Sequence, residues 1–549
     1  MRWFVRSRIP AAVFAGLLLA AAFPNIGIAG MAWIAPGLIL AITLGKSPGE
    51  SFRIGYFAGL THYLASLYWL LLIPVRGFPI LGWFALSAFL ALYPATWTWL
   101  AARLAGPQRQ TEKAELQTEP ALNPLREASR WSWGRRTRWA LSCAALWVAM
   151  EMIIARFLGG FPWNLLGTSQ YKILPLIQFA SITGVYGISF LVVWCSVSVL
   201  SAVAVIAGYP NQRSYWMREL LLPLGVLGVI LLFGFHQLSR PTTPAPVLNA
   251  TLVQPSVPQT LIWNQGNDLA RFQELLAESD RGLTNATDVL IWPEAAVPGM
   301  PRYDPEIGYA IQAFAREHKV WMIIGADDGE ATPIATNYYN ASFLVGPDGR
   351  FLESYRKRSL VIFGEYIPLE RWLPIVKMLT PVTGSYTPGD HAVQFKMDFG
   401  AATSASSINV NASPLICFED NFPHLVRRCV ESDTDFLVNL TNNGWFGEGA
   451  AQWQHAANAI FRAIENGLPL VRCTNNGLTC WVDANGRIRE FFRDGRGSIY
   501  GKGFMTVQIP LRDSTDRRPT IYNRYGDWFG WSCVGVSVLV VLVRKLRGA

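Results

Sequence analysis

Long apolar stretches separated by short polar loops dominate the first 240 residues, and one more apolar stretch lies near the end of the chain. A helix needs about 17 or more apolar residues to cross a bilayer core. Eight segments reach about that length, near residues 10–24, 26–44, 54–75, 78–104, 139–157, 178–207, 219–236 and 527–543. This pattern predicts a multi-pass α-helical membrane domain with eight transmembrane helices.

A different pattern occupies residues 238–526, where short apolar runs alternate with stretches of helical periodicity and with turn signals. Such alternation is typical of a layered α/β domain. We therefore expect three parts: residues 1–237 with seven transmembrane helices, residues 238–526 as a separate α/β domain, and residues 527–549 as the eighth helix and a tail. The polar stretch 106–137 has no periodicity and is predicted to be a cytoplasmic linker.

Basic residues fall in every second loop between the predicted helices, which determines the expected orientation. The positive-inside rule then puts both termini in the cytoplasm and residues 238–526 outside. We attribute most of the net charge of +9 to these basic loops, which set the topology. Nucleic-acid binding would need a basic, aromatic-studded face on the α/β domain, and we see none. Glu151 lies inside the fifth apolar segment, where we consider a hydrogen-bonding role and a lipid-headgroup site equally.

With 51% hydrophobic and 15% charged residues, the chain is too apolar for a soluble protein. Its seven cysteines are an odd number, which argues against a fully paired disulfide scaffold. Cys429, Cys473 and Cys480 could pair with one another in an oxidising compartment. Because no CxxC or Cys/His metal spacing occurs, we expect no metal and no cofactor.

Leu369, Trp372, Leu373, Val376 and Leu379 recur at helical spacing between two prolines. Such a segment is usually core packing. Beside a bilayer, a lid that dips into the membrane is the second interpretation.

Three chemically active side chains follow strand-like runs in the α/β domain. They are Glu294, Lys357 and Cys417, and α/β active sites collect at strand ends. Cys417 also precedes a predicted helix, whose dipole, with the Lys357 ammonium, should favour the thiolate. Glu294 could accept the thiol proton, while Lys357 and the Phe418 backbone N–H stabilise a tetrahedral oxyanion. These are the parts needed for acyl transfer through a thioester.

Several motifs make the chain recognisable: Trp292-Pro293-Glu294, Tyr355-Arg356-Lys357, Phe363-Gly364-Glu365-Tyr366-Ile367-Pro368, Cys417-Phe418-Glu419 and Asn442-Asn443-Gly444-Trp445-Phe446-Gly447. They resemble the nitrilase, or carbon-nitrogen hydrolase, superfamily and, within it, the bacterial apolipoprotein N-acyltransferases. The resemblance covers nearly the whole chain. It implies an αββα sandwich on a multi-pass membrane domain.

The resemblance also implies roles for individual residues. Glu294 would be the general base, Lys357 the oxyanion residue and Cys417 the nucleophile. The implied accessory residues are Glu365, Glu419 and Phe418, and the implied substrate-binding residues are Tyr366, Trp445 and Trp263, the last as a gate. The chain departs from the family pattern at Phe418, where Tyr is common, at Asn443, where Asp is common, and in the long 106–137 linker.

The reaction implied by the resemblance is ping-pong and needs no cofactor. Cys417 takes a fatty acyl chain from a phospholipid such as phosphatidylethanolamine, and the thioester is attacked by the α-amine of a diacylglyceryl-cysteine apolipoprotein. The protein would be a monomer of the bacterial inner membrane with its catalytic domain in the periplasm. Two rival functions are a membrane-tethered amidase and a non-catalytic lipid or lipoprotein carrier.

The alternation of basic loops predicts a topology that reporter fusions can measure. Fusions within residues 106–137 should report the cytoplasm and fusions within 245–510 the outside, because basic loops stay on the cytoplasmic side. A cytoplasmic location of Cys417 would contradict the acyltransferase hypothesis.

Overall fold

The structure is a computed structural model, which describes residues 8–75, 78–105, 124–209, 215–240, 246–262, 265–284, 286–333, 335–367, 385–400, 408–511 and 518–548. The chain divides into two compact units. The first comprises Met1–Leu70, Ile80–Arg240 and Asp527–Ala549, and the second comprises Leu71–Pro79 and Pro241–Gly526.

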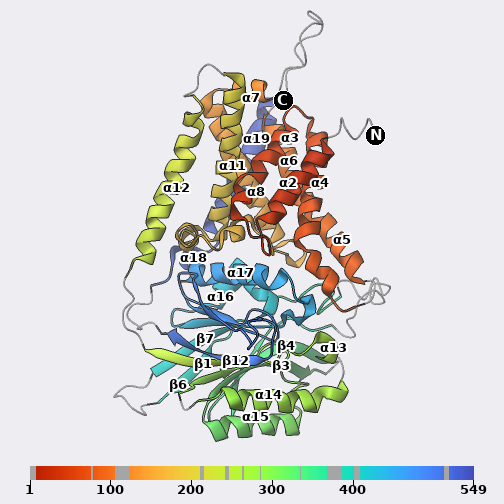
Figure 1. Cartoon of the computed structure of the whole chain (residues 1–549), viewed down its shortest axis with the longest axis vertical. Coiled ribbons are helices and arrows are strands. Elements are labelled where there is room, and N and C mark those ends of the chain that lie inside the picture. Colours follow the sequence, from red (N-terminus) through yellow and green to blue (C-terminus); the bar gives the residue numbers. More distant parts are fainter. Residues whose placement is uncertain are drawn as a thin grey trace, which may run out of the picture. The chain divides into compact units, whose positions relative to one another are not determined.

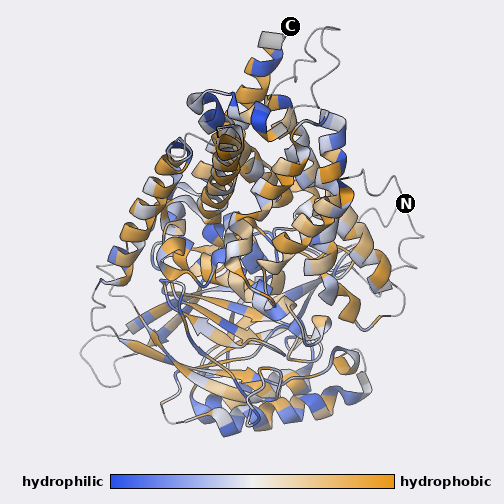
Figure 2. Cartoon of the chain, turned by 45° about the horizontal axis from the view of Figure 1, so that its top comes forward, coloured by the Kyte–Doolittle hydropathy of each residue, from blue (hydrophilic) through white to orange (hydrophobic). Residues whose placement is uncertain are grey.

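The first unit is helical and strongly apolar along most of its helices (Figure 2). Its longer helices are α2 (Ile9–Ala21), α3 (Ala35–Thr43), α4 (Pro48–Ser66), α5 (Phe78–Leu90), α6 (Leu92–Ala105), α8 (Trp133–Ile154), α11 (Val185–Gly208), α12 (Met217–Leu238) and α19 (Trp528–Gly548). Five helical stretches in the described residues are long and apolar enough to cross a membrane, with α5 and α6 counted as one. The helices are those of a membrane protein.

The eight predicted apolar segments all contain helix, although not all are long enough to span alone. The first two correspond to shorter apolar helices, Ile9–Ala21 and Ala29–Thr43. The predicted sixth segment is shorter than expected, because α11 begins only at Val185, after Gly184 adopts a positive φ of 68°. The number of crossings, eight, stays a prediction.

Buried polar contacts join helices within the first unit. Arg136 at the start of α8 pairs with Glu219 of α12 at 2.8 Å. Arg156 pairs with Asp527, just before α19. The buried Glu151 of α8 accepts hydrogen bonds from Trp147 Nε1 (3.0 Å) and from the backbone N–H of Leu166 (2.7 Å). These contacts support the hydrogen-bonding interpretation of Glu151.

The second unit contains two six-stranded sheets. The first has the order β12-β1-β2-β3-β4-β5, and the second has the order β11-β10-β9-β8-β7-β6. The strands are β1 (Val247–Gln254), β2 (Val289–Ile291), β3 (Trp321–Ala331), β4 (Thr336–Val345), β5 (Phe351–Arg356), β6 (Phe395–Phe399), β7 (Ile408–Ile416), β8 (Phe436–Thr441), β9 (Leu470–Thr474), β10 (Cys480–Val482), β11 (Ile488–Phe491) and β12 (Gly503–Pro510). In each sheet three central strands are parallel: β1, β2 and β3 in the first, and β7, β8 and β9 in the second.

Helices cover the outer faces of the two sheets, which lie against each other (Figure 1). Helices α14 (Asp268–Gly282) and α15 (Pro305–His318) lie on the first sheet, and α16 (Pro423–Cys429) and α17 (Ala451–Asn466) lie on the second. The Cys473 thiol on β9 donates to the carbonyls of Val253 and Ile291 in the opposite sheet, each at 3.3 Å. The predicted αββα sandwich is therefore confirmed.

Local sequence determines where α15 begins and ends. The Asp304 side chain accepts from the backbone N–H groups of Glu306 and Ile307, and Pro305 occupies the first helical position. Both features are typical of a helix N-terminus. The helix ends at Lys319, which adopts a left-handed conformation with φ of 53°.

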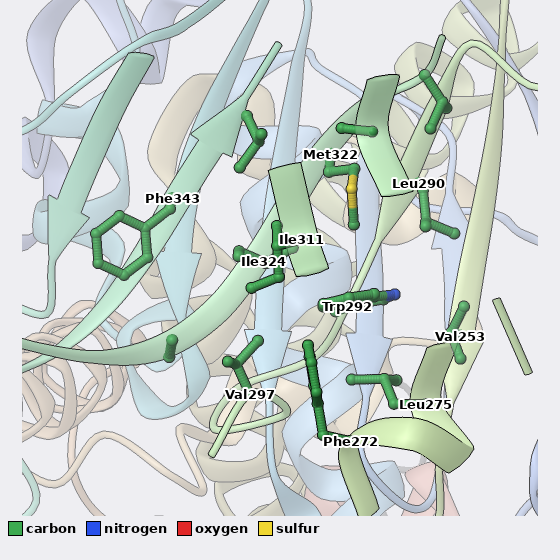
Figure 3. Packing of buried hydrophobic residues seen from close by; sticks show 14 of the residues in the cluster. Val253, Phe272, Leu275, Leu290, Trp292, Val297, Ile311, Met322, Ile324 and Phe343 are labelled. Atoms are coloured by element: carbon green, nitrogen blue, oxygen red, sulfur yellow. The ribbon is translucent and has the colours of Figure 1, made fainter. Parts of the chain in front are cut away.

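An apolar cluster fills the layer between the first sheet and its helices (Figure 3). Trp292, just after β2, is fully buried and packs edge-on against Phe272 of α14, with ring centroids 6.4 Å apart. Its Nε1 donates to Ser279 Oγ at 2.8 Å. The cluster fixes the position of Trp292, two residues before Glu294.

Some predicted features are absent or lie outside the described residues. All seven cysteines are free and buried, so the possible pairing of Cys429, Cys473 and Cys480 is not found. The amphipathic segment 369–380 and Trp263 lie outside the described residues.

Truncation of a core side chain should destabilise the second unit. Ile311→Ala should lower its free energy of unfolding by about 2–5 kcal/mol, because the fully buried side chain leaves a cavity in the cluster. The matched control is Leu269→Ala, since Leu269 is 64% exposed and its loss should change stability by less than about 0.5 kcal/mol. Thermal unfolding in detergent provides the measurement, and equal shifts in melting temperature would contradict the assignment of this core.

Candidate active site

Lys357 is the centre of a buried cluster of charges at the ends of several strands. It follows β5 directly, is 1% exposed, and its Nζ donates to Glu365 Oε1 at 2.7 Å and to Glu294 Oε1 at 3.1 Å. Burial alone would lower the pKa of Lys357, but the Glu294 and Glu365 carboxylates more than reverse this effect and hold the pKa well above its usual value. Lys357 therefore carries its positive charge between two carboxylates.

The Glu294 carboxylate is held from two sides. Its Oε1 accepts from Asn340 Nδ2 at 2.8 Å, and its Oε2 accepts from the backbone N–H of Asn442 at 2.8 Å. The turn after β2 passes close to β3, where a Cβ at Gly325 would lie 2.2 Å from the Pro293 carbonyl oxygen. Only glycine leaves room for this approach.

Asn340 on β4 links the two carboxylates. The same Nδ2 that donates to Glu294 also donates to Glu365 Oε1 at 2.9 Å, and the Asn340 carbonyl accepts from the Lys357 backbone N–H at 2.8 Å. Glu365 Oε2 accepts from the backbone N–H of Val361 at 2.8 Å. Sequence analysis placed Glu365 near Lys357 but assigned no role to Asn340 or Asn442.

Cys417 follows β7 directly and begins a short 3-10 helix, Cys417–Asn421. Its backbone φ is +51°, a left-handed conformation that costs a non-glycine residue roughly 1–2 kcal/mol. Ala295, after Glu294, and Phe363, near Glu365, also have positive φ values. Backbone strain of this kind is concentrated at active sites.

The electrostatics of Cys417 differ from the sequence-based expectation. Burial, followed by the Glu294 carboxylate, raises the pKa of the thiol to about 12, while the Lys357 ammonium and the Thr441 hydroxyl lower it only in part. We predicted that Lys357 and a following helix would favour the thiolate. Lys357 does lower the pKa of the thiol, as expected, but burial and the Glu294 charge outweigh it, so the net shift favours the protonated thiol.

Glu419 links the chain around Lys357 to the chain around Cys417 through hydrogen bonds. The fully buried carboxylate accepts from Tyr355 Oη at 2.8 Å and from the backbone N–H groups of Arg358 at 2.7 Å and Ile416 at 2.8 Å. One side chain thus holds both the end of β5 and the end of β7. The accessory role that the resemblance implies for Glu419 stays a prediction.

A further buried carboxyl group, close enough to interact with Glu294 and Glu365, was missed by sequence analysis. Asp327 on β3 accepts from Tyr386 Oη at 2.9 Å. Burial, with smaller effects from the Glu294 and Glu365 charges, raises the pKa of Asp327 to about 6, against the Tyr386 hydrogen bond. No motif marks Asp327 in the sequence, because it lies within β3 rather than at a strand end.

The predicted substrate-binding residues lie on loops of the same unit. The Tyr366 carbonyl accepts from the Phe363 backbone N–H at 2.8 Å, which closes the turn that carries Glu365. Trp445 lies in the short 3-10 helix Asn443–Phe446 after β8. The Phe418 ring is buried and packs edge-on against Phe422. The contacts of Tyr366 and Trp445 with a substrate, and the accessory role of Phe418, stay predictions.

The described residues contain no group of three His, Cys, Asp or Glu side chains suited to a metal ion. The Lys357 ammonium itself occupies the position between Glu294 and Glu365. The site therefore offers a thiol, a fixed positive charge and carboxylates that can exchange protons.

The raised pKa of Cys417 has a measurable consequence. Its alkylation by iodoacetamide should increase about tenfold per pH unit from about pH 7 to pH 10 without a plateau, because the thiolate is the reactive form. Glu294→Gln removes a nearby negative charge, so the pKa should fall and the rate at each pH should rise. Peptide mass spectrometry follows the reaction.

Cys429 is the internal control for this experiment. Its thiol is also buried, with a pKa raised to about 12 mainly by burial, but Glu294 does not contribute to that rise. Alkylation of Cys429 should therefore be unaffected by Glu294→Gln. A plateau for wild-type Cys417 below about pH 9 would contradict the raised pKa.

Comparison with known proteins gives a consistent family. Residues 15–198 match the model described as the apolipoprotein N-acyltransferase N-terminal domain, and residues 249–506 match the carbon-nitrogen hydrolase model. A carbon-nitrogen hydrolase superfamily protein from Xanthomonas campestris is a structural neighbour with a TM-score of 0.36 and 17% identity, covering 51% of this chain and 95% of that one.

Relatives at full length are more similar. The chain is 33% identical to the apolipoprotein N-acyltransferase of Geobacter metallireducens, over 98% of this chain and 95% of that protein. It is 30% identical to the apolipoprotein N-acyltransferase of Vibrio vulnificus, over 98% of this chain and 97% of that protein. The chain therefore belongs to the apolipoprotein N-acyltransferase family.

Proposed function

We propose that this N-acyltransferase moves a fatty acyl chain from a phospholipid to the α-amine of a diacylglyceryl-cysteine apolipoprotein, through a thioester on Cys417. The observation that carries the proposal is the buried Lys357 ammonium between two carboxylates. The Cys417 thiol is close enough for the charges of Glu294 and Lys357 to shift its pKa. Family membership supports the choice of acceptor.

In the first half-reaction the thiol must lose its proton as it attacks. Glu294 takes the proton from Cys417 Sγ, and the sulfur bonds to the ester carbonyl carbon of the phospholipid. The resulting oxyanion is stabilised by the Lys357 ammonium. The ester C–O bond then breaks, Glu294 returns the proton to the leaving alcohol, and a lysophospholipid departs. The acyl chain remains on Cys417 as a thioester.

In the second half-reaction the neutral α-amine of the apolipoprotein attacks the thioester carbonyl carbon. Glu294 accepts the proton that the amine loses, and Lys357 again stabilises the oxyanion. The C–S bond breaks, an amide forms, and the proton returns to Cys417. Glu365 and Asn340 keep the ammonium and the Glu294 carboxylate in place through both steps.

The apolar helices of the first unit provide the reason for a membrane-bound enzyme. Both proposed substrates are held in a bilayer by their acyl chains, so a catalytic unit attached to spanning helices meets them without extracting them into water. We place the protein in the bacterial inner membrane as a monomer, with the catalytic unit in the periplasm.

The acyl donor is tested by incubating the purified protein with phosphatidylethanolamine alone and measuring its intact mass. The proposal expects a mass increase of one acyl group, which neutral hydroxylamine removes, because thioesters are labile to it. An amidase would instead release ammonia from a soluble amide without lipid. A carrier would keep full activity after Cys417→Ala.

Variants of the three residues should affect acyl loading differently. Cys417→Ala should abolish the adduct. Lys357→Ala should slow loading by on the order of 10²–10³-fold, as for the loss of one oxyanion donor. Glu294→Gln cannot accept a proton, so its loading should recover partly as pH rises and Cys417 ionises without help. The measurement is the rate of adduct formation against pH.

Thermal stability of each variant controls for misfolding, and the pH dependence separates the roles. A purely structural Glu294 would produce a defect that does not change with pH. An adduct that still forms in Cys417→Ala would refute the assignment of the nucleophile.

A further inference from the structure

A buried polar cluster lies behind Cys417 and takes no part in the mechanism above. It is formed by Asp420 of the 3-10 helix, Asn439 of β8, His455 of α17 and Arg472 of β9, and all four residues are fully buried. Four separate elements thus send polar side chains to one point in the core. Such a convergence is costly unless every group finds a partner.

Two members of this cluster bind the backbone of Cys417. Asn439 Nδ2 donates to the Cys417 carbonyl oxygen at 3.1 Å, and His455 Nε2 lies 3.2 Å from the same oxygen. His455 Nε2 also lies 2.7 Å from Asp420 Oδ1. Both neighbours of Nε2 are acceptors, so this nitrogen carries a proton and donates to them.

The other nitrogen of His455 has the opposite role. Arg472 Nη2 lies 2.7 Å from His455 Nδ1, and a guanidinium can only donate. Nδ1 is therefore unprotonated, and the ring is the neutral Nε2–H tautomer. Asn443 fits this assignment once its amide is turned, because its Nδ2 has no partner among the described residues while its side-chain oxygen lies 3.2 Å from Nδ1.

The balance of buried charge agrees with a neutral ring. Arg472 Nη1 pairs with Asp420 Oδ2 at 2.6 Å, and the nearby Arg462 pairs with Glu465 at 2.7 Å. Each of these two ion pairs is neutral, so an imidazolium on His455 would add an uncompensated buried charge. Burial, followed by the Arg472 charge, lowers the pKa of His455 in the same sense.

We propose that His455, locked as one neutral tautomer by Arg472 and Asp420, is a positioning residue that holds the Cys417 carbonyl and thereby keeps the nucleophile in its left-handed conformation. This inference rests on the proposed role of Cys417 as the nucleophile. At a φ of +51° the Cys417 backbone relaxes readily unless its carbonyl is tethered. Relaxation would turn the thiol away from Glu294 and Lys357.

The proposal predicts a loss of rate rather than of lipid affinity. His455→Ala should lower the maximal rate of thioester formation about 10–100-fold, because a displacement near 1 Å at the reacting atom has an effect of that order. The KM for phosphatidylethanolamine should change less than about threefold, since His455 lies behind Cys417 and not beside the lipid. His455→Gln keeps an N–H donor at a similar reach and should restore most of the rate.

The matched control is Ile460→Ala on the same helix, since Ile460 is 2% exposed and its side chain packs beside Gly486. It should lower the melting temperature as His455→Ala does, yet leave the loading rate of the folded enzyme unchanged. If His455→Ala does not fold, Asn439→Ala removes the second donor to the Cys417 carbonyl and should give the same pattern. Equal rate losses in Ile460→Ala and His455→Ala, or no rescue by Gln, would overturn the proposal.

A second measurement separates this inference from the proposed function. Iodoacetamide alkylation of Cys417 reports thiol position without any lipid, and His455→Ala should change its rate while His455→Gln restores it. If wild-type enzyme forms no thioester, the proposed function fails, but the alkylation series still tests the positioning role.

Discussion

The organising constraint of this protein is a positive charge buried between two carboxylates. An ammonium that is 1% exposed is tolerated only when paired, and losing one partner of such a pair typically costs about 3–5 kcal/mol. Lys357 therefore requires Glu294 and Glu365 at fixed places, although they lie on different loops. Asn340 donates to both carboxylates, so the distance between them is fixed as well.

The same constraint explains three of the positions at which the backbone is strained. Ala295, Phe363 and Cys417 have positive φ values. Ala295 directly follows Glu294, Phe363 lies two residues before Glu365, and Cys417 carries the thiol of the site. Local conformations of this kind persist only when surrounding contacts determine them. Around Cys417 two side chains make those contacts. The Glu419 carboxylate accepts from the Ile416 backbone N–H, and His455 Nε2 lies 3.2 Å from the Cys417 carbonyl oxygen.

Part of this arrangement was predictable because α/β active sites collect at strand ends, although β2 and β5 belong to one sheet and β7 belongs to the other. Glu294, Lys357 and Cys417 each follow an apolar run, and that pattern alone grouped them. The αββα layers followed from the family motifs. Asp420, His455 and Arg472 were not predictable, because each lies in a different element and their pairing depends on how those elements pack. The pKa of Cys417 was also misjudged, since sequence shows its charged neighbours but not the depth of its burial.

A protonated resting thiol changes how the site must work. With a pKa raised to about 12, Cys417 is almost never a thiolate at neutral pH, so attack cannot begin from a stored anion. In the proposed mechanism, proton removal and C–S bond formation are therefore coupled, which requires the base, the sulfur and the carbonyl to be aligned at the same moment. On that proposal, alignment matters more than thiolate supply, and the buried polar groups that contact the Cys417 backbone would serve this alignment.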